Sequence, residues 1–274
     1  MTCIAHISDT HFGTEDAPVC LALRQALLQA APDLVVLSGD ITQRARRAQF
    51  RAARAFLDSL APLPVLTLPG NHDLPLFDLF SRFTGPYRRY LRHICPTLAP
   101  RWQGAALAVV GVNSTRVLRH KNGVLSAALV RQVAQQIAEL PQAFKVVALH
   151  HPLAVIEAGD AGNRARGADD ALAAWIDAGA DLILGGHIHL PYCILAGPAS
   201  RKAVILQAGT AVSTRRRGGQ ANSFNLVRFE PRDSRRMIIE QRDYNAHEQA
   251  FACASVRQAA FSATGWTLDS APRP

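Results

Sequence analysis

The sequence has few cysteines and no long apolar run. Its five cysteines lack the spacing of a metal-binding motif. They are Cys3, Cys20, Cys95, Cys193 and Cys253. Such an odd, scattered set indicates reduced, mostly buried thiols in a cytoplasmic protein. No stretch reaches the roughly 18–20 apolar residues that span a membrane, and the first apolar run begins too close to Met1 for a signal peptide. We therefore expect a cytoplasmic localisation and no membrane partner.

Internal repeats, low-complexity tracts and long linkers are also absent. The chain has 274 residues, 49% of them hydrophobic, which is enough to bury one large core. We therefore expect a single domain over residues 1–274. Residues 1–190 show strand–helix alternation and carry the motifs described below, whereas residues 191–274 show mainly strands and a C-terminal tail.

Acidic residues are fewer than basic ones. The 21 Asp and Glu against 30 Lys and Arg give a net charge of +9, and basic proteins attract phosphate-bearing partners. Several arginines, however, lie on a predicted helix over 44–60 whose apolar stripe includes Phe50 and Leu57. An arginine run of this kind is more typical of a solvated face, so we do not expect nucleic acid as the main partner.

Five short polar motifs occur in one order along the chain. They are Asp9-Thr10-His11, Gly39-Asp40, Gly70-Asn71-His72-Asp73, His150-His151 and Gly186-His187-Ile188-His189. A short apolar run precedes each motif and predicts a buried strand that ends there. A single strand-end Asp is often only a helix cap, but ligands in α/β sheets gather beyond the carboxyl ends of strands. The ordered set therefore predicts one site at that edge.

The motifs together offer imidazole, carboxylate and amide ligands. This donor set suits iron, manganese or zinc better than calcium or a thiolate-preferring ion. A shared carboxylate can hold two such ions about 3.5–4 Å apart, where they clamp the oxygens of a phosphoryl displacement and acidify a bound water. Glycines before Asp40, Asn71 and His187 allow sharp turns and a close approach of the backbone to an ion. The sequence therefore predicts a binuclear metal centre.

In their order and context, these motifs resemble those of the calcineurin-like metallophosphoesterase superfamily. The resemblance is strongest to its small bacterial phosphodiesterases of the class III cyclic-nucleotide and glycerophosphodiester type. It implies an α/β fold, a four-layer α/β/β/α sandwich of two mixed sheets. It also implies an enzyme that uses two divalent ions, iron or manganese first and zinc as an alternative, to hydrolyse a small phosphodiester by a metal-bound hydroxide.

The same resemblance assigns roles to nine motif residues. Three bind the first metal, three bind the second and one bridges the two: Asp9, His11 and His189; Asn71, His150 and His187; and Asp40, respectively. His72 is the catalytic histidine, which contacts the substrate phosphate and protonates the leaving group. His151 faces the cavity as a substrate-binding residue without touching the metals.

Several motif residues differ from those of sister families, which argues against membership of those families. Protein Ser/Thr phosphatases carry Asp-Arg-Gly where this chain has Gln43-Arg44-Ala45, and Glu where it has Asp73. Purple acid phosphatases place a tyrosine ligand at the position of Gln43.

Two alternatives stay open: a phosphomonoesterase or nuclease of the same superfamily, and a non-catalytic nucleic-acid-binding protein with a structural metal centre. The substrate also stays open among cyclic nucleotides, glycerophosphodiesters and other small diesters.

Three further segments have two interpretations each. The aromatic-rich segment 76–91 predicts one or two helices, which form either core or a wall of the pocket. The polar loop 159–167 either contacts substrate or merely connects elements. The arginine run 215–217 is either a surface turn or a grip on phosphate.

The last third of the chain predicts strands at 192–196, 203–207, 223–229 and 236–242. We expect them to form a second, largely antiparallel sheet stacked on the first. Residues 244–274 contain Phe251, Phe261 and Trp266, which pack on this sheet or on a partner subunit. A homo-oligomer is compatible with the sequence, because symmetric assembly is common among soluble enzymes.

Overall fold

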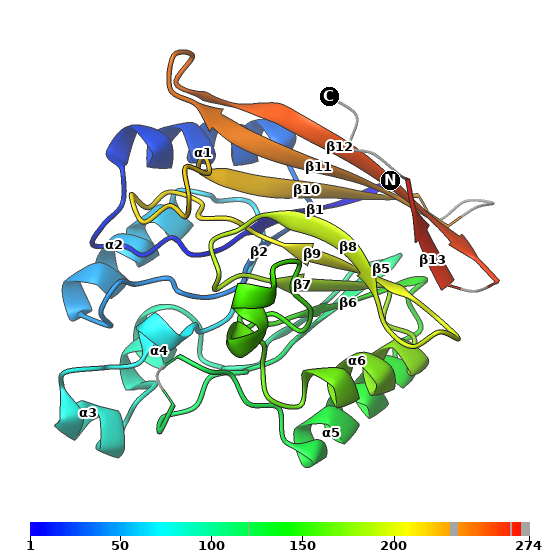
Figure 1. Cartoon of the computed structure of the whole chain (residues 1–274). Coiled ribbons are helices and arrows are strands. Elements are labelled where there is room, and N and C mark those ends of the chain that lie inside the picture. Colours follow the sequence, from blue (N-terminus) through cyan, green and yellow to red (C-terminus); the bar gives the residue numbers. More distant parts are fainter. Residues whose placement is uncertain (120, 231–234, 264, 270–274) are drawn as a thin grey trace.

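Two mixed sheets form the centre of the computed structural model, which describes residues 1–119, 121–230, 235–263 and 265–269 (Figure 1). The first sheet has seven strands: β1 (Thr2–Ile7), β2 (Leu34–Leu37), β3 (Val65–Thr67), β10 (Ser223–Glu230), β11 (Arg236–Asn245), β12 (Ala250–Ser262) and β13 (Gly265–Leu268). Their order in space is β13-β12-β11-β10-β1-β2-β3. β1, β2 and β3 are mutually parallel, and β10 pairs antiparallel to β1.

The second sheet has six strands. They are β4 (Arg101–Gln103), β5 (Leu107–Gly111), β6 (Phe144–Ala148), β7 (Leu182–Gly185), β8 (Tyr192–Ala196) and β9 (Ala203–Gln207), in the spatial order β4-β5-β6-β7-β9-β8. The four inner strands are parallel, whereas the edge strands β4 and β8 are antiparallel to their neighbours.

Six α-helices are found in the described residues. They are α1 (Ala17–Ala30), α2 (Arg47–Asp58), α3 (Leu79–Thr84), α4 (Arg88–His93), α5 (Ala127–Ala138) and α6 (Ala168–Asp177), with short 3₁₀ turns at Asn71–Asp73 and Ala158–Asn163. Helix α5 follows Ser126, whose side chain caps it by accepting a hydrogen bond from the Leu129 N–H. The segment 76–91 contains the short helix α3 and the first part of α4, which continues to His93.

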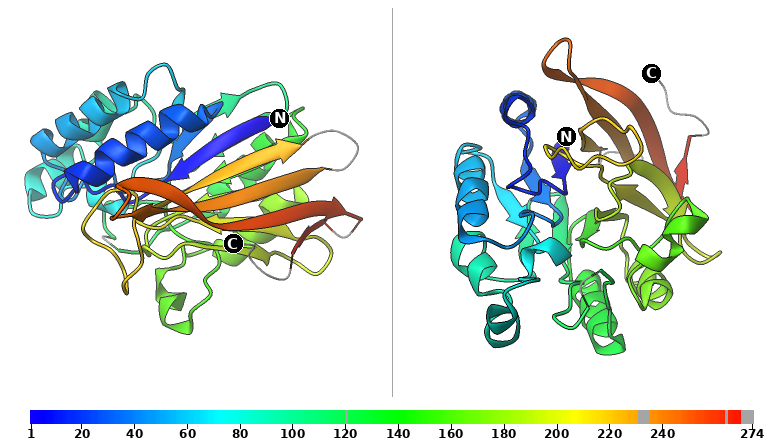
Figure 2. Two further views of the ribbon diagram at one scale, coloured as in Figure 1. Left: turned by 90° about the horizontal axis from the view of Figure 1, so that it is seen from above. Right: turned by 60° about the vertical axis from the view of Figure 1, so that its left-hand side comes forward.

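Three apolar clusters show how these elements form layers. Val35 and Leu37 of β2 pack with residues of α1 and α2, whereas Val36 faces the second sheet. Val147 of β6 packs with residues of α5 and α6, and Val146 faces the first sheet. The inner strands β2, β6 and β7 are therefore buried on both faces, which explains their continuous apolar runs. The four-layer α/β/β/α sandwich is confirmed, and the right view of Figure 2 shows helices on both outer faces.

The division of strands between the two sheets differs from the expectation. Strands after His189 do not form a sheet of their own: β8 and β9 extend the sheet of β5–β7, and β10–β13 extend that of β1–β3. β9 is buried along its whole length beside β7, and β10 is mostly buried beside β1. The apolar residues of both strands are buried at these inner positions. The tail 244–274 adds strands to the first sheet as far as it is described, and residues 264 and 270–274 lie outside the description.

Asp181, just before β7, joins several elements. Its fully buried carboxylate accepts hydrogen bonds from the Lys145 N–H and from Trp266 Nε1, each at 3.0 Å. It also forms ion pairs with Arg235 at 2.6 Å and Arg201 at 3.2 Å. The carboxylate therefore ties β6 and β13 to the loops that carry the two arginines.

Replacing Asp181 with alanine should lower the free energy of unfolding by about 3 kcal/mol, because buried donors would lose their acceptor. Urea denaturation at pH 7 measures this loss. Asp177→Ala, an exposed position on α6, is the matched control and should change stability by less than about 0.5 kcal/mol. A loss below about 1 kcal/mol for Asp181→Ala would contradict the assigned structural role.

All five cysteines are free, four of them half-buried and Cys253 exposed. Burial raises the pKa of Cys3 to about 11 and those of Cys20 and Cys193 to about 12. Thiols with such pKa values are poor nucleophiles at neutral pH. Among the described residues, no helix combines the length and apolar character needed to cross a membrane.

Candidate metal centre

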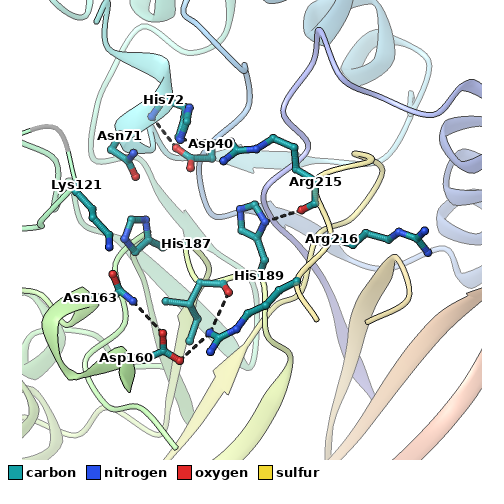
Figure 3. A pocket seen from close by; sticks show the side chains of 12 residues that line it. Asp40, Asn71, His72, Lys121, Asp160, Asn163, His187, His189, Arg215 and Arg216 are labelled. Carbon is teal, nitrogen blue, oxygen red and sulfur yellow. Dashed lines mark hydrogen bonds and ion pairs between the residues drawn. The ribbon is translucent and has the colours of Figure 1, made fainter. Parts of the chain in front are cut away.

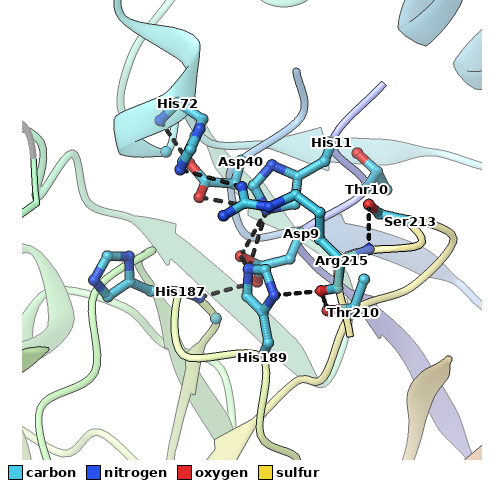
Figure 4. Close-up of polar contacts among 12 residues, drawn as sticks. Asp9, Thr10, His11, Asp40, His72, His187, His189, Thr210, Ser213 and Arg215 are labelled. Atoms are coloured by element: carbon cyan, nitrogen blue, oxygen red, sulfur yellow. Dashed lines mark hydrogen bonds and ion pairs between the residues drawn. The ribbon is translucent and has the colours of Figure 1, made fainter. Parts of the chain in front are cut away.

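Five strands deliver the motif residues to one edge of the sandwich. Asp9 follows β1, Asp40 follows β2, Asn71 follows β3, His150 follows β6 and His187 follows β7. The first three strands belong to one sheet and the last two to the other. The carboxyl ends of these strands from both sheets therefore meet at the site. As a result, His11 and His189, which are 178 residues apart in sequence, lie in contact there (Figure 4).

Two groups of side chains lie close enough to hold metal ions. The first contains Asp9, His11, Asp40 and His189, and the second contains Asp40, His150 and His187. The candidate ligand atoms within each group all lie within 4.8 Å of one another. Asp40 belongs to both groups, so its carboxylate stands between them.

The first group is centred on the imidazole of His189. Its Nε2 lies 3.2 Å from Asp9 Oδ1 and 3.1 Å from His11 Nε2. His11 Nε2 lies 3.7 Å from both Asp9 Oδ1 and Asp40 Oδ2. Imidazole nitrogens and carboxylate oxygens therefore converge on one small volume.

The second group is centred on the imidazole of His150. Its Nε2 lies 3.3 Å from Asp40 Oδ1 and 3.2 Å from Asn71 Oδ1. His187 stands beside it, with ring centroids 5.1 Å apart. The Nδ1 atom of His187 is buried and has no hydrogen-bond partner in the described part of the chain. Such an orphaned nitrogen is what a bound cation would satisfy.

Backbone carbonyls orient two of these imidazoles. His189 Nδ1 lies 2.6 Å from the Arg215 carbonyl oxygen, and His150 Nδ1 lies 2.9 Å from the Ser38 carbonyl oxygen. Each Nδ1–H must donate to its carbonyl, so Nε2 is the nitrogen that faces the carboxylates, where it shares a proton with them or would bind a cation. This is the usual outer-shell arrangement of metal-binding histidines.

The buried charge at the site also favours a cation. Asp9 and Asp40 are 0% and 1% exposed, and only histidines form ion pairs with them among the described residues. Burial alone would raise the pKa of Asp40, but His150 and His72 hold that pKa well below its usual range. Burial disfavours protonated His150, yet the Asp40 carboxylate raises the pKa of that imidazole to about 9. Protonated histidines therefore balance the charge of the two buried carboxylates. Divalent ions could take the place of those protons.

Backbone strain is concentrated at the site. Eight described residues other than glycine have a positive φ, and five of them carry candidate ligands: Asp9 (53°), His11 (43°), Asp40 (47°), His187 (77°) and His189 (57°). A left-handed conformation costs such residues of order 1–3 kcal/mol each, and it persists where the surroundings impose it, often at functional sites. The surrounding fold therefore keeps these five residues in a backbone conformation that they would not prefer by themselves, with their side chains directed into the site.

Two glycines allow close packing around the carboxylates. A Cβ atom on Gly70 would lie 2.2 Å from Asp40 Oδ1, and one on Gly186 would lie 2.6 Å from Asp9 Oδ2. The sequence predicted that these glycines let the backbone approach a metal ion closely. In the structure, the backbone of Gly70 and Gly186 instead approaches the carboxylates that are candidate metal ligands. Of the three glycines that precede ligands, Gly39 alone has a positive φ, 109°.

His72 lies on the wall of the site, outside both ligand groups. Its N–H donates to Asp40 Oδ1 at 2.8 Å, and its Nδ1 lies 2.9 Å from the Gln43 carbonyl oxygen. Its Nε2 lies 3.4 Å from Arg215 Nη1. The next residue, Asp73, is buried and accepts hydrogen bonds from the N–H groups of Ile41, Thr42 and Gly70. The His72 turn is thereby tied to the loop that carries Asp40.

His151 lies differently from the expectation. It is 1% exposed, its Nδ1 lies 2.8 Å from Ser114 Oγ, and its ring packs 4.6 Å from that of His187. Burial, with His187 and His150 nearby, holds the pKa of His151 well below its usual range. His151 thus supports His187 from behind, and the predicted contact with substrate is corrected to a packing contact.

A cavity of about 540 Å³ opens beside the two groups (Figure 3). Candidate ligands and His72 form one side of it. Residues from four segments between the strands and α-helices complete the lining: Lys121, Asp160, Asn163, Ile188, Arg215, Arg216 and Arg217. The loop 159–167 and the arginine run therefore contribute to the cavity. Lys121 was not singled out from the sequence, because an isolated lysine carries no periodic or motif signal.

The three arginines differ in their contacts. Arg217 forms ion pairs with Glu157 at 2.6 Å and Asp160 at 2.7 Å, so its charge is neutralised. Arg215 Nη1 lies 3.0 Å from Gln43 Oε1, and in Figure 3 this side chain reaches toward Asp40 and His72. Arg215 therefore places a guanidinium beside the candidate metal centre.

Comparisons with known proteins agree with this geometry. The family model described as calcineurin-like phosphoesterase matches residues 3–191. The chain is 31% identical over 169 residues to the glycerophosphodiester phosphodiesterase GpdQ of Enterobacter lignolyticus, covering 54% of this chain and 56% of that protein. It is 26% identical over 258 residues to a cAMP/cGMP dual specificity phosphodiesterase of Mycobacterium tuberculosis, covering 83% of this chain and 76% of that protein. The solved structure of PhoD shares the fold, with a TM-score of 0.72 at 11% identity over 98% of this chain and 72% of that one. The match therefore spans little more than half the length of the first of these relatives.

Proposed function

Because this chain belongs to the calcineurin-like phosphoesterase family, we propose that it is a metal-dependent hydrolase of phosphodiester bonds in a small substrate. The observation that carries the proposal is the Asp40 carboxylate, shared by two ligand groups at the base of a cavity lined with basic side chains. The names of two relatives, one acting on glycerophosphodiesters and one on cyclic nucleotides, support a diester over a monoester.

Two divalent ions would be held by the residues expected from the sequence. Asp9, His11 and His189 would hold one ion and Asn71, His150 and His187 the other, with Asp40 between them. This donor set suits iron and manganese, and zinc as an alternative. When bound, such ions offset the charge of a phosphate and lower the pKa of a water molecule toward neutrality.

The chain's own side chains would orient the substrate. His72 presents Nε2 to the cavity, because its Nδ1–H donates to the Gln43 carbonyl oxygen. Arg215, held by Gln43 Oε1, would bind a non-bridging phosphoryl oxygen beside it. Lys121 on the opposite loop adds a positive charge that favours an anionic substrate. His72 is also the group placed to give a proton to the leaving oxygen.

Replacing Arg215 with alanine should lower kcat/KM on the order of 10²-fold, since a donor aimed at the phosphoryl oxygens is lost. The metal content should stay unchanged, because it is the backbone carbonyl of Arg215 that orients His189. Arg215→Lys should recover part of the loss. Arg131→Ala, exposed on α5, is the matched control for removing one positive charge. An Arg215→Ala variant with wild-type kcat/KM would contradict the assigned contact.

The proposed function is tested by substrate choice. Metal-stripped protein reloaded with manganese should hydrolyse bis(p-nitrophenyl) phosphate at least about tenfold faster than p-nitrophenyl phosphate. That result would justify a panel of glycerophosphodiesters and cyclic nucleotides. A preference for the monoester would make the protein a phosphatase. Absence of turnover on both, together with salt-sensitive binding of nucleic acid, would favour the non-catalytic alternative.

A further inference from the structure

Large apolar side chains are exposed around α3. Phe77 is 73% exposed, Leu79 60%, Phe80 79% and Phe83 64%. Leu118, on the loop after β5, is 82% exposed, and Arg82 of α3 donates to the carbonyl oxygen of its neighbour Val117. These five apolar residues, called the α3 patch below, make up more than half of the nine large hydrophobic side chains exposed in the described residues. Such a concentration marks an interaction surface.

The orientation of α3 is the reverse of that in an ordinary surface helix. Its arginine, Arg82, is only 7% exposed and donates to the Pro75 carbonyl oxygen at 2.7 Å, while the leucine and phenylalanines point outward. Asp78 caps the helix through Ser81 and forms an ion pair with Arg89 at 2.7 Å. Polar contacts therefore hold the helix to the protein, and its apolar side is left for a partner.

The surroundings of the α3 patch are strongly basic. Residues 74–93 contain four arginines and one acidic residue, Asp78, which is already paired. Residues 113–124 contain two arginines and one lysine without any acidic residue. Arg88, Arg92 and Arg119 are exposed, and the Arg44 guanidinium lies 4.9 Å from the centre of the Phe77 ring. A partner for this face should therefore be both apolar and anionic.

A second copy of the chain does not meet this requirement. In a two-fold dimer the same patch would face itself, and the arginines on the two copies would repel each other. An anionic lipid surface does meet it. Aromatic and leucine side chains enter the boundary between headgroups and acyl chains, while arginines at the rim contact lipid phosphates.

We propose that the α3 patch docks this protein on an anionic lipid surface. Docking of this kind needs no membrane-spanning segment. The patch lies on segments that also carry cavity residues: Leu118 precedes Lys121 by three positions, and Phe77 follows the 3₁₀ turn that carries His72. If the proposed function holds, docking would present the cavity to phosphodiesters at or near the headgroups. The docking itself does not depend on the proposed function.

Co-sedimentation of the full chain with vesicles tests the docking. Vesicles of phosphatidylcholine with a third of phosphatidylserine should bind the protein at least about tenfold more tightly than vesicles of phosphatidylcholine alone. Phe80→Ser combined with Phe83→Ser should weaken that binding at least about tenfold, with Tm unchanged because both side chains are already exposed. Leu21→Ser, 55% exposed on α1 away from the patch, is the matched control and should bind as the wild type does.

Three outcomes would overturn the proposal. One is failure of the wild type to bind anionic vesicles even at low salt. Another is loss of binding for Arg88→Glu with Arg92→Glu but not for the phenylalanine variant, which would indicate attraction of charge alone. The third is a concentration-dependent dimer that the phenylalanine variant disrupts, without vesicle binding, which would make a second copy the partner. Turnover of bis(p-nitrophenyl) phosphate in solution is assayed separately, so a failure of the proposed function stays distinguishable from a failure of docking.

Discussion

Replacing Asp40 with asparagine should weaken the binding of both metal ions and lower kcat/KM on the order of 10³-fold or more. Asp40 is common to both ligand groups, so loss of its charge weakens both at once. Asparagine retains an oxygen that can accept the His72 N–H, and it tolerates a positive φ, which is 47° at this position. The variant therefore removes charge with little disturbance of the backbone.

Elemental analysis by mass spectrometry measures this effect directly. We expect the metal content to fall from two ions per chain to less than one, with diester turnover falling in parallel. Asp170→Asn, exposed on α6, is the matched control and should keep both ions. An Asp40→Asn variant that retained two ions and more than a tenth of the wild-type kcat would show that the carboxylate is not the shared ligand.

The second large effect is expected for His72→Ala. This variant should keep both metal ions, because His72 lies outside the two ligand groups and its backbone N–H, which contacts Asp40, is retained. Its kcat should fall on the order of 10²–10³-fold, the range typical for the loss of a general acid together with a contact to phosphate. Metal analysis and steady-state kinetics on the same preparation separate the two effects.

The leaving group distinguishes the two contributions of His72. A p-nitrophenolate leaving group needs no proton, whereas an alkoxide does. If His72 is a general acid, the loss in kcat should be clearly larger for glycerophosphodiesters than for bis(p-nitrophenyl) phosphate. Equal losses would leave only the phosphate contact, and an undiminished kcat on both substrates would exclude any role in the reaction.

Two strands of the last third of the chain were predicted from their apolar runs with accurate bounds. Strand β8 has the bounds expected from the sequence, Tyr192–Ala196, and so does β9, Ala203–Gln207. The helix that begins after Ser126 was also predictable, because its cap and apolar stripe are local features of the chain. Such features depend on neighbours within a few residues, so they can be recognised without knowledge of the fold.

The assignment of strands to sheets was not predictable in the same way. β10 pairs with β1, so that Ala5 stands opposite Leu226, more than 200 residues later. Nothing in the apolar pattern of β10 distinguishes that partner from a neighbouring hairpin strand. The choice depends on how much apolar surface each arrangement buries over the whole molecule, and this is a global quantity.

The same division applies to the site and its surroundings. The sequence by itself determined which residues can bind metal and that they follow strands, because motif spacing and apolar runs are local. Only the tertiary structure decided that His151 packs behind His187, that Arg215 lies beside His72, and that α3 buries its arginine while exposing its phenylalanines. Each of these depends on contacts between segments far apart in the chain, whose energies no local pattern records.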